Sequence, residues 1–437
     1  MRILVISNLY PPYFMGGYEL GCQDVVDGLR QRGHEVTVFT STYGVDAASQ
    51  DDSIYRIFSP RYPLRQYKMW KPLYFIPLLL SELTDWRQFL HYYKKASPDI
   101  IYIWNGLGLS YSLLYKIQEL ATPVAFYIFE HWLTKLHENT APEGFSLYHE
   151  PWIGFWIKTE KNVLMHAAKK ILAALLSLFG FTVRFKPFPL HHVHYACNML
   201  KEDALKVGLP VHTARVIYYG LNTGEGPFSA LAQEPPRGGY ALTTPLKLLY
   251  VGNLLRSKGP HTLLQACGLL DARGINYNLT IVGKKLDEPY YDELLKIASD
   301  LQLGTRIKFE LNLGRNALIS LYKDHHILII PSIWREPLGM VFLEGMIAGI
   351  PVIHTGAGGS SELVQDGENC LLFAPGNHDA LARQIERLAQ DRDLYAGLSA
   401  AGKQTVMERY TLAKMLDEIE EDLSGLVNNG IATRSLS

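Results

Sequence analysis

The 437-residue chain is long enough for about two or three domains, and its 48% apolar and 19% charged residues exclude a disordered protein. Its 42 Lys and Arg residues balance 43 Asp and Glu residues, so the basic excess typical of nucleic-acid-binding proteins is missing and we expect no nucleic-acid partner. The four cysteines are far apart without a CxxC pair, which argues against a disulfide scaffold or zinc ribbon and favours a cytoplasmic protein. The first residues lead directly into a strand without the pattern of a signal peptide.

The first half of the chain alternates predicted strands and helices. Residues 2–7 form a short apolar run typical of a buried strand, and a helix is predicted at 18–32, ending at Gly33. Such alternation predicts a parallel sheet with right-handed crossovers. Further strands are predicted at residues 35–40, 99–104, 124–129, 192–196 and 215–219.

Residues 220–245 interrupt this pattern, because Gly, Pro and Thr dominate them without periodicity. We therefore place an N-terminal domain at 1–222, a linker at 223–245, a second domain at 246–405 and a last helix at 406–426.

The second domain repeats the alternation of strands and helices. The fold class is therefore α/β, with two doubly wound, Rossmann-like parallel-sheet domains that face each other across a cleft. Ligands of such sheets bind beyond the carboxyl ends of the strands, so the cleft is the expected binding site. The strands are predicted at residues 246–251, 278–282, 306–309, 326–331 and 351–355, the helices near 259–272, 290–301, 315–322, 339–348 and 379–390, and an amphipathic tail at 394–426.

Two segments of the first half combine basic with apolar and aromatic side chains. Residues 61–95 carry seven Lys or Arg against two Asp or Glu, and residues 158–186 carry six against one. Within the second segment, residues 171–183 form a run of 13 apolar or small residues, whereas a bilayer-spanning helix needs roughly 20. Two interpretations stay open for this run, a buried helix and an interfacial helix flanked by basic residues.

The strongest motif is the segment EPLGMVFLE, which begins at Glu336, ends at Glu344 and follows a predicted strand. Pro337 suits the first turn of a helix, whose free backbone N–H groups carry partial positive charge and favour a phosphate. The two carboxylates repel a phosphate, but each can accept two hydrogen bonds from a hydroxyl pair. A helical rise of roughly 12 Å between them suits a sugar nucleotide, which has hydroxyls on both sides of a diphosphate. The N–H groups belong to Leu338, Gly339, Met340 and Val341.

Three further glycine-rich turns follow predicted strands. The segment GNLLRSKG at 252–259 places Lys258 at the start of a helix, where its point charge can meet a phosphate, although the spacing is not that of a Walker loop. Gly16 and Gly17 precede the first helix, and because their spacing does not match the dinucleotide fingerprint we expect no nicotinamide cofactor. The segment GAGGSSE at 356–362 is another candidate anion-binding loop.

Together these motifs resemble the retaining GT-B glycosyltransferases of glycosyltransferase family 4, the group with an E-x7-E motif. The resemblance covers nearly the whole chain, and its most specific part is EPLGMVFLEGMIAGIPVIHT followed by GAGGSSELVQDGENCLLF. The opening RILVISNLYPPYFMGGYE resembles the family's first strand and glycine loop, and VIYYGLNT resembles its domain-closing strand and turn. The segment RYTLAKML resembles the family's terminal helix, which returns to the N-terminal domain.

The resemblance implies a role for each matching residue. Glu336 would hold hydroxyls of the transferred sugar, Glu344 the ribose of the nucleotide, and the N–H groups of residues 338–341 the distal phosphate. Lys258 would neutralise the leaving diphosphate, so Lys258 and Glu336 are the predicted catalytic residues.

Other positions depart from the family pattern or extend it. Gly17, next to Gly16, would let the phosphate and sugar lie against the first loop. Asn253 stands where the family usually has an arginine, so Arg256 is the candidate to supply this charge to the donor site. Leu311 stands where the family usually has a glycine, which leaves base recognition open.

The acceptor side of the site is less defined in the sequence. The segment FEHW after the strand at 124–129 gives Glu130 and His131 as candidates, although the family's usual order is not reproduced. The segment HHVH at 191–194 is expected to pack within the fold, and no metal site is predicted.

The predicted activity is transfer of a hexose-type sugar from a UDP-, GDP- or ADP-linked donor with retention, by a front-face mechanism in which the departing phosphate takes the acceptor's proton. Positioning and stabilisation of the diphosphate supply the catalysis, so neither a metal nor a cofactor is expected. The alternatives are a soluble small-molecule acceptor, an epimerase or phosphorylase on the same fold, and a degenerate sugar-nucleotide-binding protein.

The basic, aromatic segments fall on the half of the chain that binds the acceptor in this family. Basic residues beside apolar ones attract anionic membrane surfaces. We therefore expect a lipid-linked or membrane-proximal glycan acceptor in cell-surface polysaccharide or glycoconjugate synthesis, an anionic membrane surface as a further partner, and a cytoplasmic enzyme that is peripheral at the inner face of the membrane.

Overall fold

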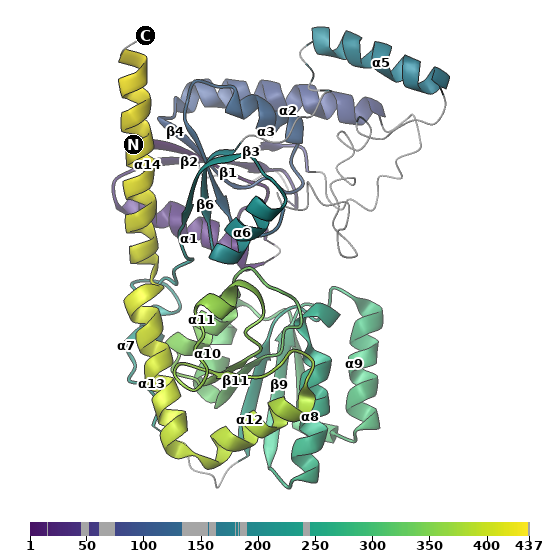
Figure 1. Ribbon diagram of the computed structural model, residues 1–437, viewed down its shortest axis with the longest axis vertical. Coiled ribbons are helices and arrows are strands. Elements are labelled where there is room, and N and C mark those ends of the chain that lie inside the picture. The colour runs from purple at the N-terminus through teal and green to yellow at the C-terminus, as the bar shows by residue number, and fades with distance from the viewer. Residues whose placement is uncertain are drawn as a thin grey trace. The chain divides into compact units, whose positions relative to one another are not determined.

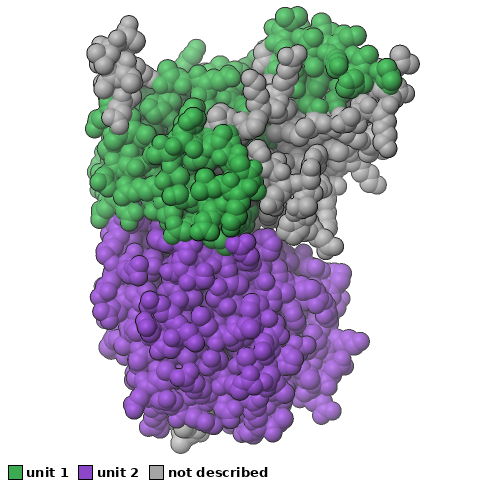
Figure 2. Space-filling model, viewed as in Figure 1, with its two compact units in different colours: residues 1–217, 416–437 green, residues 218–415 purple. Residues whose placement is uncertain are grey.

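The computed structural model describes residues 1–14, 16–44, 52–60, 75–132, 156, 163–179, 181, 183, 190–238 and 245–435. The chain divides into two compact units (Figure 2). Unit 1 comprises Met1–Ile217 with Leu416–Ser437, and unit 2 comprises Tyr218–Met415. Each unit is built on a sheet whose strands are all parallel, so the predicted α/β class with two Rossmann-like domains is confirmed.

The sheet of unit 1 has the strand order β3-β2-β1-β4-β5-β6-β7. Its central strands are continuous apolar runs because helices cover both faces of such a sheet. β3 was not predicted, since its segment IYRIF carries Arg56 and lies at the sheet edge, and β7 begins four residues before the predicted strand. The strands are β1 Arg2–Ser7, β2 Glu35–Ser41, β3 Ile54–Phe58, β4 Ile100–Asn105, β5 Val124–Ile128, β6 Leu190–Tyr195 and β7 Val211–Val216.

The helices of unit 1 connect these strands (Figure 1). α1 ends before Gly33, whose φ of 85° needs a glycine, as predicted. α3 begins after Ser110, whose hydroxyl accepts the N–H of Leu113. The helices are α1 Gly17–Gln31, α2 Phe75–Ala96, α3 Tyr111–Gln118, α5 Val163–Leu178 and α6 Asn198–Lys206.

The predicted apolar run at 171–183 does not form a buried helix. α5 ends at Leu178, and most of its described side chains are exposed. Parts of the two basic segments, including residues 61–74 and 157–162, lie outside the described residues. Within the described ranges, no helix has both the length and the apolar content to cross a bilayer.

The sheet of unit 2 has the order β10-β9-β8-β11-β12-β13. Leu248, Ile281 and Ile329, from three neighbouring strands, belong to one core that packs against the helices. The strands are β8 Leu246–Val251, β9 Tyr277–Gly283, β10 Ile307–Leu311, β11 Ile327–Ile330, β12 Val352–His354 and β13 Leu371–Leu372. The helices are α7 Ser229–Gln233, α8 Pro260–Ala272, α9 Glu288–Asp300, α10 Arg315–Asp324, α11 Met340–Ile347, α12 His378–Gln390 and α13 Arg392–Arg409, with single-turn 3₁₀ helices η5 Arg256–Lys258, η6 Gly304–Arg306 and η7 Gly358–Glu362.

The last helix, α14 Leu412–Ser435, begins in unit 2 and continues into unit 1. Its acidic side chains meet basic side chains of unit 1: Arg32 pairs with Asp417 at 2.8 Å and with Glu420 at 3.0 Å. His34 contacts the same Glu420 at 3.0 Å. These contacts fasten α14 to the sheet and helices of unit 1.

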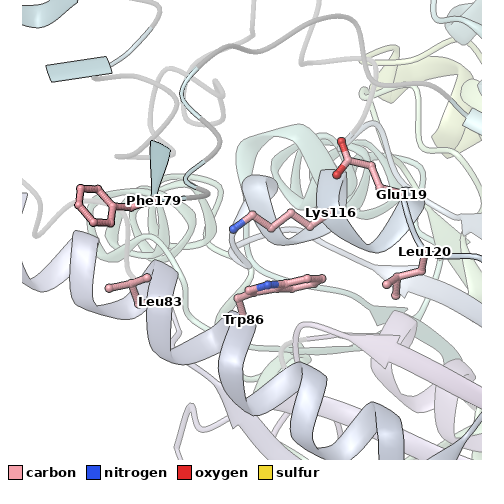
Figure 3. A pocket seen from close by; sticks show the side chains of 6 residues that line it. All are labelled: Leu83, Trp86, Lys116, Glu119, Leu120 and Phe179. Carbon is pink, nitrogen blue, oxygen red and sulfur yellow. The ribbon is translucent and has the colours of Figure 1, made fainter. Parts of the chain in front are cut away.

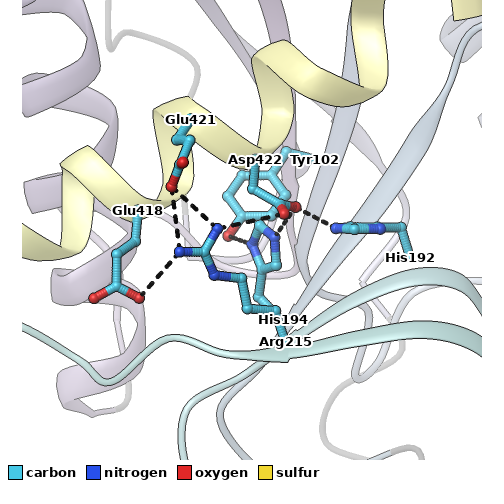
Figure 4. A network of polar contacts seen from close by, with 7 residues as sticks. All are labelled: Tyr102, His192, His194, Arg215, Glu418, Glu421 and Asp422. Carbon is cyan, nitrogen blue, oxygen red and sulfur yellow. Dashed lines mark hydrogen bonds and ion pairs between the residues drawn. The ribbon is translucent and has the colours of Figure 1, made fainter. Parts of the chain in front are cut away.

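A buried polar network makes the second attachment of α14 (Figure 4). Asp422 contacts His192 and lies 2.7 Å from Nε2 of His194, and both histidines come from β6. The buried Tyr102 hydroxyl lies 2.9 Å from His194 Nδ1. Because that hydroxyl needs an acceptor for its proton, it donates to Nδ1, so His194 carries its own proton on Nε2 and donates to Asp422.

This proton arrangement accounts for the HHVH segment as a structural network. The ligand atoms of His192, His194 and Asp422 lie within 4.8 Å of one another, which is close enough for metal ligands. However, the His194 Nε2 that would bind a metal is occupied as a donor to Asp422. Burial, opposed by the bond to Asp422, lowers the pKa of His194 and keeps its imidazole neutral near pH 7.

Candidate functional site

The candidate site lies where the strand order of the unit 2 sheet reverses. β8 lies between β9 and β11, so the connections after β8 and β11 run in opposite directions across the sheet. Doubly wound sheets bind ligands beyond the carboxyl ends of the strands at such a switch point. The loop after β8 carries Lys258, and the loop after β11 carries Glu336.

Lys258 and Glu336 form an ion pair that joins these two loops. The Lys258 side chain is 32% exposed and that of Glu336 is 11% exposed, so the pair is reachable from solvent mainly through the lysine. Lys258 ends the 3₁₀ turn η5, and Gly259 follows with a φ of 70°, before Pro260 begins α8. A Cβ at Gly259 would overlap the Pro331 carbonyl, so this close approach requires glycine.

Backbone hydrogen bonds hold the loops together around the pair. The Ser257 carbonyl accepts the N–H groups of Ile333 at 2.9 Å and Trp334 at 3.1 Å. On the other side, the Thr355 hydroxyl after β12 donates to the Ser332 carbonyl at 2.8 Å. The ends of β8, β11 and β12 therefore form one rigid edge.

The glycine loop after β12 supports Glu336 directly. The N–H of Gly359 donates to the Glu336 carbonyl at 2.7 Å. Gly358 has a φ of 81°, and a Cβ there would overlap the Glu336 backbone. Binding of an anion by this loop stays a prediction; what the structure shows is that the loop supports the backbone of Glu336.

The helix that follows Glu336 lies close to the predicted range of 339–348, but Pro337 is not in its first turn. α11 begins at Met340 with Gly339 as its N-cap, so Pro337 and Leu338 lie in the preceding loop. Gly339 has a φ of −83° and a ψ of 120°, so its backbone is extended and the helix begins only at Met340. The N–H groups at the positive end of the helix are therefore those of Gly339, Met340, Val341 and Phe342, and Leu338 of the predicted set is not among them. The estimate of a continuous helical rise between the two glutamates was wrong, because only Glu344 lies in the helix.

Glu344 is buried and accepts a hydrogen bond from the Tyr322 hydroxyl of α10 at 2.7 Å. Burial, and next the negative charge of Glu344, raise the pKa of Tyr322 well above its usual range, so the hydroxyl stays a donor. Tyr322 was not predicted, because nothing in its sequence position connects it to Glu344.

His354 is a second residue that sequence reasoning missed. It ends β12, directly before the glycine loop, and its Nδ1 accepts the N–H of Gly356 at 2.7 Å. Burial, and next the positive charge of Lys258, lower its pKa to about 4. A neutral imidazole therefore orders the start of the glycine loop. The histidine that precedes the glycines in PVIHTGAGG was the available signal.

Two other predicted donor-site residues, Arg256 and Asn253, have partners within unit 2. The Arg256 guanidinium pairs with Glu293 and lies 5.1 Å from the ring centre of Tyr290, both on α9. Asn253 precedes the turn, and its carbonyl accepts the Tyr250 hydroxyl at 3.1 Å. Arg256 would have to leave Glu293 to replace the missing arginine charge.

The remaining predicted residues belong to unit 1. Gly16 caps α1, its N–H donating to the Glu19 carboxylate at 3.0 Å, and Gly17 is the first helical residue. They follow β1, which lies beside β4 at the reversal of the unit 1 sheet. Glu130 and His131 follow β5; Glu130 is exposed, and His131 Nδ1 lies 4.0 Å from Asp203.

A separate pocket of about 380 Å³ lies in unit 1 between α2 and α3 (Figure 3). Its floor is apolar and aromatic, with Leu83 and Trp86, and Lys116 lies 5.3 Å from the ring centre of Trp86. Glu119 and Phe179 stand at its sides. With one cation and one carboxylate it lacks the array of amide donors that a diphosphate needs, so the unit 2 loops remain the donor-site candidate.

Two family profiles match the chain. The profile described as Glycosyl transferases group 1 matches residues 237–405, and the one described as Glycosyltransferase Family 4 matches residues 15–174. The chain is a GT4-type glycosyltransferase. The first match contains all the loops of the candidate site in unit 2 of this glycosyltransferase.

Individual relatives show the same relationship. An uncharacterized glycosyltransferase of Methanocaldococcus jannaschii is 24% identical over 422 residues, which are 94% of this chain and 95% of that protein. A GDP-mannose-dependent alpha-(1-6)-phosphatidylinositol monomannoside mannosyltransferase of Mycobacterium tuberculosis is 27% identical over 212 residues, or 47% of this chain and 54% of that protein. The glycosyltransferase thus spans about half the length of this second relative.

Among solved structures, HepE of Anabaena in complex with UDP covers 97% of this chain and 100% of its own, with a TM-score of 0.67 and 20% identity. This likeness shows the fold, and the glycosyltransferase has two Rossmann-like domains of the GT-B type, as predicted.

Proposed function

We propose that this glycosyltransferase moves a hexose-type sugar from a nucleoside-diphosphate sugar to a hydroxyl of a lipid-linked or membrane-proximal glycan, with retention of anomeric configuration, in cell-surface polysaccharide or glycoconjugate synthesis. The observation that carries the proposal is the Lys258–Glu336 ion pair at the switch point of unit 2. Glu336 stands a few residues before α11, whose first N–H groups have no partner within the helix. One cation, one carboxylate and a row of amide donors match a diphosphate that carries a sugar.

Each group has a distinct part in donor binding. The α11 amides and Lys258 would hold the diphosphate, and on binding the Lys258 ammonium would turn from Glu336 toward the phosphate oxygens. Glu336 would then accept hydrogen bonds from sugar hydroxyls, and Glu344, oriented by Tyr322, would accept those of the ribose. The UDP bound to HepE and the GDP-mannose in the mycobacterial relative's name both support a nucleoside-diphosphate donor.

The reaction would run on one face of the sugar. The bond between the anomeric carbon and the diphosphate oxygen breaks, and its electron pair stays on the phosphate, where Lys258 and the amides stabilise it. The acceptor hydroxyl forms its bond to the anomeric carbon on the same face, and its proton passes to the departing phosphate. Holding the donor and the acceptor in the reactive orientation supplies much of the rate enhancement.

Two observations support a lipid-linked or membrane-proximal acceptor. The mycobacterial relative acts on a phosphatidylinositol mannoside, according to its name. In addition, no Asp or Glu occurs between Glu160 and Glu202, a stretch that contains six Lys or Arg residues and belongs to the half expected to bind the acceptor.

The test is an assay of the whole chain with UDP-glucose, GDP-mannose and ADP-glucose, each with and without lipid-linked oligosaccharide acceptors. We expect nucleoside-diphosphate release that depends on one donor and on acceptor, with a product of retained configuration by NMR. An inverted product would contradict the front-face mechanism. An epimer or free sugar formed without acceptor would show one of the other activities of this fold, and donor binding without turnover would show a binding protein.

A further inference from the structure

The helix α5 has two different faces. Leu172 and Leu176 pack with Leu78 of α2 and with Phe181 in a small apolar cluster of their own. Ile171, Leu175 and Leu178, spaced by four and three residues, share an adjacent stripe of the helix. Figure 1 shows α5 beside α2 at the margin of unit 1.

The outward face is apolar and open to solvent. Ile171 is 64% exposed, Leu175 50% and Leu178 82%, and Phe179, directly after the helix, is 75% exposed. Single exposed apolar residues are common, but three on one helical stripe with a fourth directly after the helix mark an interaction surface. An apolar stripe on a helix of 16 residues suits a helix that lies flat in a membrane interface.

The charge around this stripe selects the partner. Lys169 and Lys170 directly precede Ile171, and Lys170 is exposed. The surrounding sequence from 161 to 201 has six basic residues and no acidic one. An apolar stripe within a basic segment complements an anionic lipid surface, in which the apolar side chains enter the acyl boundary and the ammonium groups stay with the phosphates.

The pocket between α2 and α3 adjoins the same surface. Phe179 lines it together with Trp86 and Lys116, as Figure 3 shows. Trp and Lys side chains favour the headgroup level of a bilayer, because each has an apolar body and a polar end. Glu119 on the far side opposes an anionic ligand in the pocket itself, so the stripe and not the pocket is the contact surface.

We propose that the outward face of α5, made of Ile171, Leu175, Leu178 and Phe179, docks the enzyme on an anionic lipid bilayer. The purpose of this contact would be to bring the donor site to a membrane-borne acceptor, and this purpose rests on the proposed function. Binding of α5 to the bilayer does not depend on the proposed function.

The test is flotation of the full-length enzyme with vesicles of phosphatidylcholine alone or mixed with phosphatidylglycerol. The wild type should bind only the anionic vesicles, and the variant with Ile171→Gln, Leu175→Gln and Leu178→Gln should lose about tenfold or more of that binding. A matched control replaces three exposed leucines elsewhere, Leu205, Leu286 and Leu295, by Gln and should bind like the wild type. Thermal unfolding of both variants checks that the fold is retained.

Equal binding by the α5 variant, or no binding of the wild type to anionic vesicles, would overturn the proposal. The proposal would also be overturned if the wild type sedimented as a dimer and the α5 variant as a monomer, because a second copy would then cover the stripe. Lys258→Ala separates the two proposals: it should float like the wild type while losing donor turnover, whereas the α5 variant should retain donor binding in detergent.

Discussion

The two sheets of this glycosyltransferase have the same strand order at their centres, yet the edges at their switch points carry different chemistry. In unit 2 this edge holds Lys258 and Glu336, with Glu344 on the following helix. In unit 1 the corresponding edge has Gly16 and Gly17 and, behind them, buried aromatic rings such as Tyr18, whose hydroxyl donates to the Tyr127 carbonyl at 2.9 Å. The same topology thus carries a charged pair in one unit and a glycine turn in the other.

The largest expected effect comes from removing the charged groups of unit 2. Lys258→Ala and Glu336→Gln should each lower the transfer rate by roughly 10²–10³, because each removes a group that acts on the diphosphate or the transferred sugar. The measurement is kcat for nucleoside-diphosphate release. Lys308→Ala, which removes a surface lysine from an ion pair of the same unit, serves as the control and should stay near the wild-type rate. If both site variants had the wild-type rate, the charged groups of unit 2 would have no part in transfer, and the two edges would not differ in function.

The next effect tests whether the glycine loop supports the carboxylate. Gly358→Ala should destabilise unit 2 by several times the roughly 1–2 kcal/mol expected for alanine in a left-handed conformation, because its Cβ also overlaps the Glu336 backbone. Gly367→Ala is the matched control, with a φ of 75° and open space at its Cβ. Urea unfolding of both variants measures the difference. Similar values for the two would show that the loop and Glu336 are not mechanically connected.

A pH effect should appear in unit 2. The pKa of His354 is lowered to about 4 by burial and then by Lys258, below the value of about 6.5 in an unfolded chain. Between these pH values the unfolded state binds more protons, so the free energy of unfolding should fall by roughly 3 kcal/mol as the pH drops from about 6.5 to about 4. Urea unfolding across this range measures it, and His354→Asn should flatten that part of the profile. An unchanged slope in the variant would contradict a neutral, buried His354.

The smallest effect concerns orientation of the second carboxylate. Tyr322→Phe removes the hydroxyl that donates to Glu344 at 2.7 Å and should cost about 1–2 kcal/mol of donor binding. The expected result is a rise in KM for the donor of about tenfold with kcat nearly unchanged, since the ribose lies away from the reacting bond. A fall in kcat at constant KM would assign Glu344 to the chemistry instead.

Much of the fold follows from hydrophobic pattern. β8 has the predicted bounds, because the largely apolar segment LKLLYV between Pro245 and Gly252 is typical of a strand buried in a parallel sheet. β3 and β7 lie toward the edges of their sheet and carry exposed or charged residues, so the pattern failed there. The predicted strand continued past the end of β7 because the tyrosines there were counted as apolar. In the structure they lie in the connection that follows the strand.

The candidate site was predictable in its residues but not in its contacts. Lys258 and Glu336 could be named as candidates from the glycine turns and from family resemblance. That the strands before them, β8 and β11, are neighbours in the sheet is seen only in the structure. The support that Tyr322 gives to Glu344, and His354 to the glycine loop, depends on tertiary contacts between separate elements, which no local pattern encodes. Pro337 was wrongly placed in the first turn of α11, because proline is equally compatible with the preceding loop.

The most direct test of the central claim is calorimetric binding of UDP, GDP and their hexose conjugates to the wild type, Lys258→Ala and Glu336→Gln. Lys258→Ala should weaken the nucleoside diphosphate and the nucleotide sugar alike, whereas Glu336→Gln should weaken only the nucleotide sugar. If both variants bind the nucleotide sugar as tightly as the wild type, the loops of β8 and β11 are not the donor site.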